Sequence, residues 1–242
     1  MSRYIPLFDS FVFNGRSSLD FKCKISGNET FRRPARDITS IEVPGRNGEL
    51  TIDNGRYKNV TISYNCFIAE NIRENLSSLI NWLSQSPGYS RLEDTYHPNE
   101  YRMARYTGPL DPEVFYAEDG RFDLEFDCQP QRWLMSGEQP VEVSASGSVV
   151  LINPTLKTAL PKIVVTAGTG QIGIGSQTVT LSANNGATII DSEMQDTYEG
   201  ATNRNGNISF SNGRYPELAP GSTTITAGAG MTLAVYPRWW QL

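Results

Sequence analysis

Apolar residues in the first half of the chain alternate with polar ones, and this period of two predicts β-strands. The opening run, 4–26, turns at Asn14-Gly15 and predicts a hairpin whose second strand includes Leu19, Phe21, Cys23 and Ile25. The later runs of this half predict strands at 60–68, 90–92, 101–106, 113–116 and 121–128.

One segment of the first half has a different period and predicts a helix over 71–84. Its apolar residues are spaced for a single helical stripe, and they are Ile72, Leu76, Leu79, Ile80 and Leu83. Asn71 and Glu74 fit the spacing of a capping box, and Ser86-Pro87-Gly88 marks the end. We expect this stripe to cover one face of the sheet.

The stretch 41–52 predicts a hairpin that presents an arginine at its tip. Two short alternating patterns flank the neighbouring turn signals Pro44-Gly45 and Asn47-Gly48, so Arg46 lies between the two turns. Arg46 is either a solvent-facing turn residue or part of a contact with another copy of the chain. The candidate contact residues are Pro44, Gly45, Arg46 and Gly48.

The second half has fewer charges and more Ser, Thr, Gly and Asn, which places a domain boundary near 132–138. We therefore predict domains at 1–134 and 135–242. Short strands with turn signals between them indicate a β-sandwich or jelly roll in the second domain. These strands are expected at 141–143, 149–152, 161–165, 170–175, 178–181, 188–191, 206–210, 223–226 and 231–236.

Composition supports a mainly β protein and excludes some classes of function. The 242 residues include 21 Gly, 14 Pro, 11 Tyr and 10 Phe, which favours many short strands. The net charge is -5, opposite in sign to that of a typical nucleic-acid binder. The sequence has no run of eighteen apolar residues and no apolar segment of the signal-peptide type near Met1, so we expect neither membrane spanning nor export.

Residues with catalytic or metal-binding chemistry are sparse. The three cysteines lie in separate strand-like runs and are expected to be buried free thiols, in Cys23, Cys66 and Cys128. His97 is the single histidine, which is too few for a histidine-based zinc cluster. Asp123, Glu125 and Asp127 share one strand face, where a glycosidase pair, a calcium site or plain solvation are the alternatives. We expect no catalytic residues, no metal and no cofactor.

Two adjacent tryptophans, Trp239 and Trp240, lie near the end of the sequence. Aromatic side chains in a jelly roll can stack on sugars, or they can seal the core of the domain. The first reading makes the chain a carbohydrate-binding adhesion module that recognises host cell-wall glycans, and Trp239 and Trp240 are then the candidate sugar-stacking residues.

Short motifs along most of the chain resemble the distal tail protein family of long-tailed (siphovirus-type) bacteriophages. In the first half these are Phe13-Asn14-Gly15, Val43 to Gly48, the helix, Gly88 to Leu92 and Phe126 to Pro130. In the second half they are Asn153-Pro154, Leu160 to Lys162, Ile190 to Glu193, Tyr215 to Leu218, Pro220-Gly221 and Pro237 to Trp240.

The resemblance implies a non-enzymatic structural protein at the distal end of the phage tail. Its fold would be an N-terminal ring-forming β domain with one α-helix on the sheet and a C-terminal galectin-like β-sandwich. A hexameric ring would join the major tail tube protein to the tail-associated lysin or tail fibre and to receptor-binding or baseplate proteins. Pro44, Gly45, Arg46 and Gly48 would then belong to a subunit or tube contact. Phage DNA would pass through an acidic lumen without specific binding.

Overall fold

The computed structural model describes residues 8–26, 30–108 and 120–242. The chain forms two compact units, Met1–Arg132 with Leu242, and Trp133–Gln241. Both are built from antiparallel strands, with one α-helix among the described residues, so the mainly β prediction is confirmed. The strand predicted at 113–116 lies outside the described residues.

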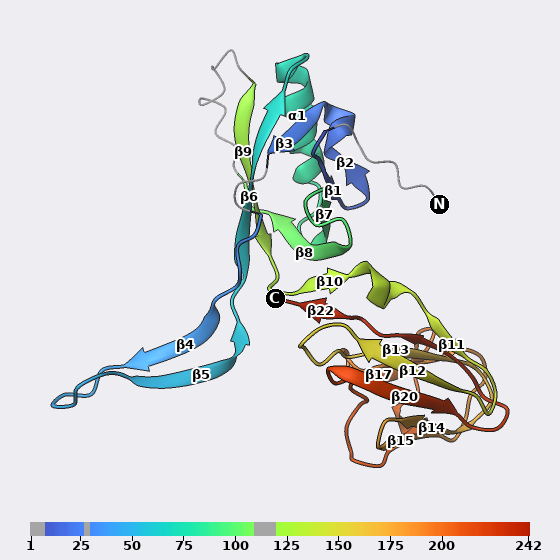
Figure 1. The fold of residues 1–242 in the computed structure, drawn as a ribbon. Coiled ribbons are helices and arrows are strands. Elements are labelled where there is room, and N and C mark those ends of the chain that lie inside the picture. Colours follow the sequence, from blue (N-terminus) through green and yellow to red (C-terminus); the bar gives the residue numbers. More distant parts are fainter. Residues whose placement is uncertain (1–7, 27–29, 109–119) are drawn as a thin grey trace. The chain divides into compact units, whose positions relative to one another are not determined.

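The main sheet of the first unit has the strand order β2-β1-β7-β8-β9-β6-β3 (Figure 1). Its strands are β1 (Phe11–Phe13), β2 (Arg16–Ser17), β3 (Cys23–Ser26), β6 (Val60–Ile68), β7 (Ser90–Asp94), β8 (Glu100–Tyr106) and β9 (Arg121–Cys128). In β6 and β9 alternate side chains are buried, as their period of two predicts. Their register pairs Ile62 with Phe126 and Tyr64 with Leu124, which aligns the two apolar faces.

The helix α1 (Ile72–Leu83) supplies the other layer of this core. Leu79 and Leu83 are fully buried, and the Trp82 ring stacks on Phe21 with 4.9 Å between centroids. The predicted helix is therefore confirmed, but its capping box is wrong. Asn71 has a left-handed backbone with φ 46° and makes no side-chain cap, whereas a capping residue normally has an extended backbone.

The opening hairpin is also only partly as predicted. Asn14 and Gly15 have positive φ angles, which confirms the turn between β1 and β2. The predicted second strand is wrong over its first half, because Ser18–Phe21 forms a 3-10 helix, η1. The Ser17 hydroxyl accepts a hydrogen bond from the Leu19 N–H at the start of η1, so local capping overrides the alternating pattern.

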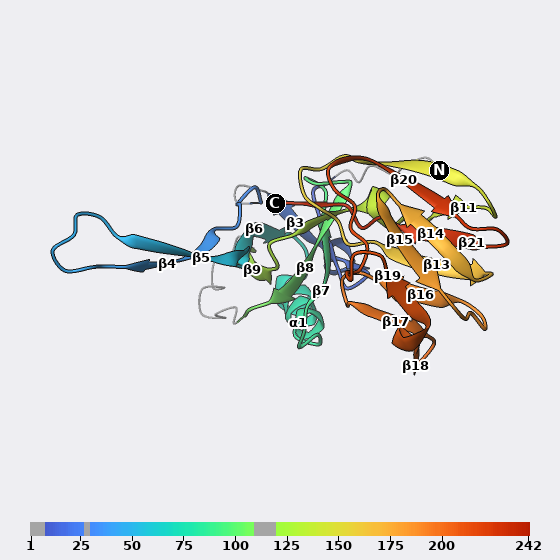
Figure 2. The ribbon, with the colours of Figure 1, turned by 90° about the horizontal axis from the view of Figure 1, so that it is seen from below.

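The second unit is a β-sandwich of two antiparallel sheets (Figure 2). The first has the order β11-β21-β13-β16-β17-β18, with strands β11 (Val141–Val143), β13 (Lys162–Ala167), β16 (Thr188–Asp191), β17 (Asp196–Glu199), β18 (Thr202–Asn203) and β21 (Thr232–Tyr236). The second has the order β12-β20-β14-β15-β19, with strands β12 (Ser148–Asn153), β14 (Gly170–Ile174), β15 (Gln177–Leu181), β19 (Ile208–Phe210) and β20 (Gly221–Ala227). Both sheets contribute their buried faces to one apolar core.

Short elements complete this unit. Strand β10 (Arg132–Leu134) pairs with β22 (Trp240–Gln241), and the 3-10 helices are η3 (Met135–Glu138) and η4 (Asn205–Asn207). The glycine-rich stretch near residue 170 is part of strand β14, which continues through a tight turn into β15. No helix follows it, so its backbone does not form a phosphate-binding loop.

Candidate functional site

Strands β4 (Arg36–Ile41) and β5 (Leu50–Tyr57) form a two-stranded sheet of their own. Figures 1 and 2 both show this hairpin as a ribbon separate from the main sheet of its unit. Every residue from 38 to 56 is exposed. The hairpin is thus held by its own ladder and side chains and does not contribute to the core of the unit.

One face of the hairpin is apolar although solvent surrounds it. The register pairs Ile41 with Leu50 and Thr39 with Ile52, which places Ile41, Leu50 and Ile52 on the same face. Their exposed fractions are 41%, 43% and 46%. Thr51 lies on the opposite face, paired with Ser40. An apolar face on an isolated hairpin is a surface suited to contact with another polypeptide.

The tip of the hairpin contains all four residues predicted as a contact. The Arg46 N–H donates to the Val43 carbonyl at 3.1 Å, and Gly45 has φ 81°, so Pro44 and Gly45 are the central residues of a type II turn. Gly48 has φ 83°, a conformation that strains residues with a Cβ atom. Pro44, Gly45, Arg46 and Gly48 are all exposed, and the turn at 44–45 and the bend at 47–48 place Arg46 at the end of the hairpin.

Ion pairs hold the base of the hairpin in place of a core. Asp37 accepts a hydrogen bond from Arg56 Nε at 2.7 Å. Asp53 accepts from Arg36 Nε at 3.0 Å, and the Arg36 guanidinium lies 4.8 Å from the centre of the Tyr57 ring. The Arg56 hydrogen bond lowers the pKa of Asp37, and the Arg36 hydrogen bond lowers the pKa of Asp53. Both carboxylates are therefore charged near neutral pH.

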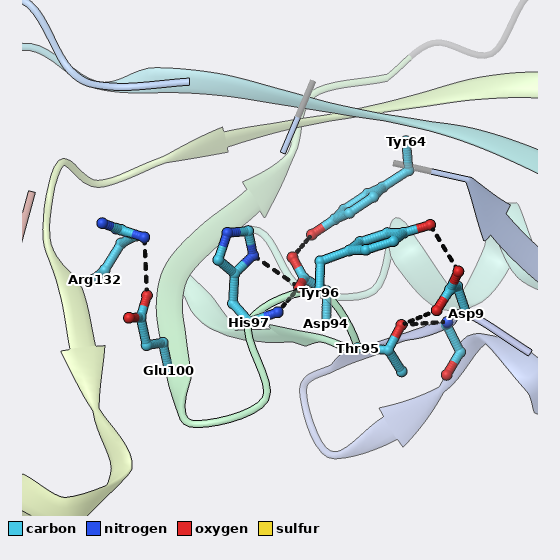
Figure 3. A network of polar contacts seen from close by, with 9 residues as sticks. Asp9, Tyr64, Asp94, Thr95, Tyr96, His97, Glu100 and Arg132 are labelled. Carbon is cyan, nitrogen blue, oxygen red and sulfur yellow. Dashed lines mark hydrogen bonds and ion pairs between the residues drawn. The ribbon is translucent and has the colours of Figure 1, made fainter. Parts of the chain in front are cut away.

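The first unit also contains a partly buried polar network around Asp94 (Figure 3). Tyr64 donates its hydroxyl to Asp94 Oδ2 at 2.8 Å. The backbone N–H of His97 donates to Asp94 Oδ1 at 2.8 Å, and the ring atom Nδ1 of His97 lies 2.9 Å from the same oxygen. Burial by itself raises the pKa of Asp94, but the contacts with His97 and Tyr64 outweigh it and lower that pKa. Burial raises the pKa of Tyr64 well above its ordinary value, so its hydroxyl remains a donor.

Neighbouring contacts show that this network fixes the turn between β7 and β8. Thr95 and Tyr96 each donate a hydroxyl to Asp9 at 3.1 Å, and Arg132 forms an ion pair with Glu100 at 3.1 Å (Figure 3). His97, the single histidine of the sequence, lies in this turn. Sequence reasoning missed this network. Its one signal was an Asp three residues before a His, a spacing that occurs in many ordinary turns.

The acidic face of β9 makes cross-strand contacts. Asp127 accepts from Asn59 at 2.9 Å and from Arg105 at 2.9 Å, and Ser63 donates to Glu125 at 3.3 Å. Asp123 is exposed on the same strand. Over residues 8–26, 30–108 and 120–242, no group of three His, Cys, Asp or Glu side chains is arranged to hold a metal ion.

The three cysteines are buried free thiols, as predicted, and all belong to the first core. Burial raises the pKa of Cys128 to about 12, and it also raises the pKa of Cys66 well above its ordinary value. Since the thiolate is the reactive form, these side chains behave as small apolar groups in the folded chain.

The two tryptophans near the end of the sequence lie in different environments. Trp239 is 6% exposed and belongs to the core of the second unit, so its ring faces are covered. Trp240 is partly buried, and its Nε1–H donates to the Thr158 carbonyl at 3.0 Å. Of the two predicted sugar-stacking residues, only Trp240 has an accessible surface.

Two motifs that are far apart in sequence meet in the second unit. Arg238 makes a bidentate ion pair with Asp191, with distances of 2.7 Å and 2.8 Å. Asp191 is 1% exposed, and its Oδ1 also accepts from the Glu193 N–H at 3.1 Å. This pair joins the last residue of β16 to the segment after β21, and sequence reasoning did not predict it. Among the helices that the structure describes, none has the length and apolarity needed to cross a membrane.

Comparison with known proteins gave a match among solved structures. No protein-family model matches the sequence, and no curated protein matches it. Among solved structures, the chain is similar to the Dit protein (gp 19.1) of phage SPP1, described as a paradigm of the hub adsorption apparatus in phages that infect Gram-positive bacteria. The TM-score is 0.69 at 14% identity, and the match covers 97% of this chain and 99% of the SPP1 protein. The chain therefore has the fold of the SPP1 Dit protein, and its resemblance to the distal tail protein family is confirmed at the level of the fold.

Proposed function

We propose that the chain is a structural protein of a phage tail tip, where it forms a hexameric ring that acts as a hub. The observation that carries this proposal is the fold shared with a hub adsorption protein over almost the whole chain. The role is architectural and not catalytic. The protein would be located in the virion, at the distal end of the tail.

The β4–β5 hairpin is the proposed contact between neighbouring copies in the ring. Its apolar face, formed by Ile41, Leu50 and Ile52, is uncovered in the single chain. Burying side chains of this size contributes roughly 1.5 to 3 kcal/mol each when they are fully covered, and these are about half exposed in one copy. A ring uses two different surfaces on each subunit, so the hairpin of one copy would lie on the body of the next.

The ring has two faces that would bind different neighbours. We assign the major tail tube protein to one side, and the tail-associated lysin or tail fibre with receptor-binding or baseplate proteins to the other. The tip residues Pro44, Gly45, Arg46 and Gly48 belong to the subunit or tube contact. Phage DNA would cross the central opening without specific binding, because a chain of net charge -5 repels phosphate.

Light scattering after size exclusion, with negative-stain images of the same peak, tests the assembly. We expect the mass of a hexamer and ring-shaped particles with a central hole. A particle of another closed symmetry, or a monomer both alone and with purified tail tubes, would contradict the ring.

A matched pair of variants tests the hairpin surface. Ile52→Glu places a charge on the apolar face and should reduce assembly, whereas Thr51→Glu places the same charge on the opposite face and should leave it intact. Arg46→Glu tests the tip in the same assay. Because these positions are exposed, circular dichroism should be unchanged in all three variants. Normal rings from Ile52→Glu would remove this face from the contact.

A further inference from the structure

Among the described residues, β12 is the longest edge strand of the two sandwich sheets and of the main sheet of the first unit. The other edges of the two sandwich sheets and of the main sheet of the first unit are short: β2 and β18 have 2 residues each, β11 and β19 have 3, and β3 has 4. Strand β12 has 6 residues and, among the residues that the structure describes, it pairs on one side only, with β20. A long edge presents a row of backbone N–H and C=O groups that can pair with another strand.

The usual protections of an edge are missing from β12. Its sequence, Ser148-Val149-Val150-Leu151-Ile152-Asn153, contains no charged residue, no proline and no glycine. Its register with β20 runs without a bulge from Ser148 to Asn153. Natural sheets normally use such features to prevent strand addition, so this edge is open to pairing.

The outward face beside this edge is apolar. Val150 and Ile152 are 56% and 72% exposed, and Leu156, just after the strand, is 91% exposed. Leu151 points to the opposite side and is 5% exposed in the core. The edge therefore combines unpaired backbone with exposed side chains of high β-propensity.

The strands of the sheet that contains β12 are uncharged, although the chain as a whole is acidic, and Lys157 is the first charged residue after β12. None of the five strands β12, β20, β14, β15 and β19 contains a charged residue. The sequence has no ionisable side chain from 143 to 156 or from 218 to 237, apart from the Tyr236 hydroxyl. Two copies with net charge -5 repel one another over most of their surface, but not across this one. A neutral patch with an apolar centre is what an interface between like-charged copies requires.

We propose that β12 pairs with β12 of a second copy of this chain, in antiparallel orientation. In an antiparallel pair, residues that lie opposite one another point to the same face of the sheet. The exposed residues of the two copies therefore lie opposite one another only if the two-fold axis passes through a residue of β12, and not between two residues. An axis at Leu151 places Val150 opposite Ile152 of the second copy, and Ile152 opposite its Val150. An axis at Val150 would instead place Ile152 opposite Ser148, so the Leu151 register buries more apolar surface.

This contact goes beyond the proposed ring and uses another surface. A contact that relates two copies by a two-fold axis uses the same surface of both, so it links two copies and no more. A ring contact instead continues from one copy to the next. Pairing through β12 would therefore connect chains in pairs, and in an assembled ring it would join one ring to another.

The test uses the full chain with Ile52→Glu, which suppresses the proposed ring. Light scattering over a range of concentrations should then show a dimer. Adding Ile152→Lys should raise the concentration at the midpoint of dimerisation at least about tenfold, because two lysines would face the neutral strand. Thr180→Lys is the matched control, since it adds the same charge to the outer face of β15, on the same sheet but away from the edge, and it should leave the dimer intact.

A second measurement tests the register. In the double variant Val150→Cys with Ile152→Cys, oxidation should give a covalent dimer on a non-reducing gel, since the three native thiols are buried. A chain that stays monomeric, or a dimer that Ile152→Lys leaves unchanged, would overturn the proposal. If Ile52→Glu fails to stop ring formation, the apolar face of the β4–β5 hairpin is not the ring contact. The β12 contact is then tested separately by whether Ile152→Lys halves the particle mass.

Discussion

Strands β5 and β6 follow one another in the chain, yet their surroundings are opposite. Apolar residues occupy alternate positions along the whole of β6, and they do so at the start of β5, at Leu50 and Ile52. In β6 these residues are buried, with Ile62 at 1% and Ile68 at 0% exposure, whereas in β5 Leu50 and Ile52 are 43% and 46% exposed. The same local pattern therefore gives a core strand in one case and an uncovered ribbon in the other.

The difference depends on what lies opposite each apolar face. The inner face of β6 packs with α1 and β1 in one cluster that includes Leu79 and Phe11. Within the part of the chain that the structure describes, strand β5 pairs with β4 alone, and no helix or second sheet covers its side chains. Alternation thus identifies an apolar face, while its burial requires a second layer. An apolar face without that layer within the chain is available for a contact between chains.

The strongest test of this comparison introduces the same charge into both environments. Leu79→Asp should destabilise the first unit by about 4 kcal/mol or more, because it removes buried apolar volume and buries a carboxylate without a partner. Ile52→Asp should change the free energy of unfolding by less than about 0.5 kcal/mol. Thermal denaturation followed by circular dichroism measures both. Equal losses for the two variants would show that the hairpin contributes to the core after all.

A second test compares two bidentate ion pairs of the same chemistry. Asp191 with Arg238 is buried, whereas Asp53 with Arg36 is exposed. Arg238→Gln should cost about 3 kcal/mol in the second unit, because it leaves a buried carboxylate unpaired. Arg36→Gln should leave the melting temperature of both units unchanged within error.

The pH dependence of Arg238→Gln provides the control. Burial alone raises the pKa of Asp191, but Arg238 and nearby N–H groups outweigh it and lower that pKa below the usual 3.8. Stability from this carboxylate is thus fully present above its unfolded pKa and is lost as the pH falls through the lower folded pKa. The difference in the free energy of unfolding between wild type and Arg238→Gln should therefore become smaller below about pH 4. A difference that stays constant down to pH 2 would assign the loss to packing of the arginine side chain.

A smaller effect is expected at the tip of the hairpin. Gly48→Ala places a Cβ on a residue with φ 83°, which costs about 1 kcal/mol. Because the hairpin does not share the core, the cost should appear as faster hydrogen exchange in β4 and β5, with an unchanged melting temperature. Asn47→Ala is the control, since Asn47 does not have a positive φ. Similar exchange in the two variants would mean that the loop relaxes without strain.

Thiol labelling distinguishes the two environments with little change in stability. The three native cysteines should react with a thiol reagent at pH 8 only after unfolding, because they are buried and the pKa of Cys128 is about 12. Ile52→Cys should add one thiol that reacts at once in the folded chain. Rapid labelling of the wild-type chain would contradict the burial of the first core.

Elements with a clear local period were predictable from the sequence. In each of these elements the apolar pattern repeats at least three times. They are the strand over 60–68, the strand over 121–128 and the helix near 72–83. Predictions failed where one capping residue decided the structure. At Ser17 a hydroxyl starts a 3-10 helix within an alternating run, and at Asn71 a left-handed backbone replaces the expected capping box.

Part of the candidate site was also predictable, because its turns depend on neighbouring residues. The turn signals Pro44-Gly45 and Asn47-Gly48 located the hairpin tip, although only Gly45 and Gly48 take the positive φ that such turns allow. The apolar face below the tip was not predictable as an exposed surface. Its exposure follows from the lack of any packing partner for β4 and β5, and no local pattern encodes that.

The sequence by itself determined the helix and most of the strands, the hairpin tip and the neutral strands of the second unit, because these depend on residues close together in the chain. Only the tertiary structure decided which apolar faces are covered, that Trp239 is in a core and that Asp191 meets Arg238. It also decided that β12 is an edge strand. These features depend on contacts between residues far apart in sequence, and such contacts form only when the sheets assemble.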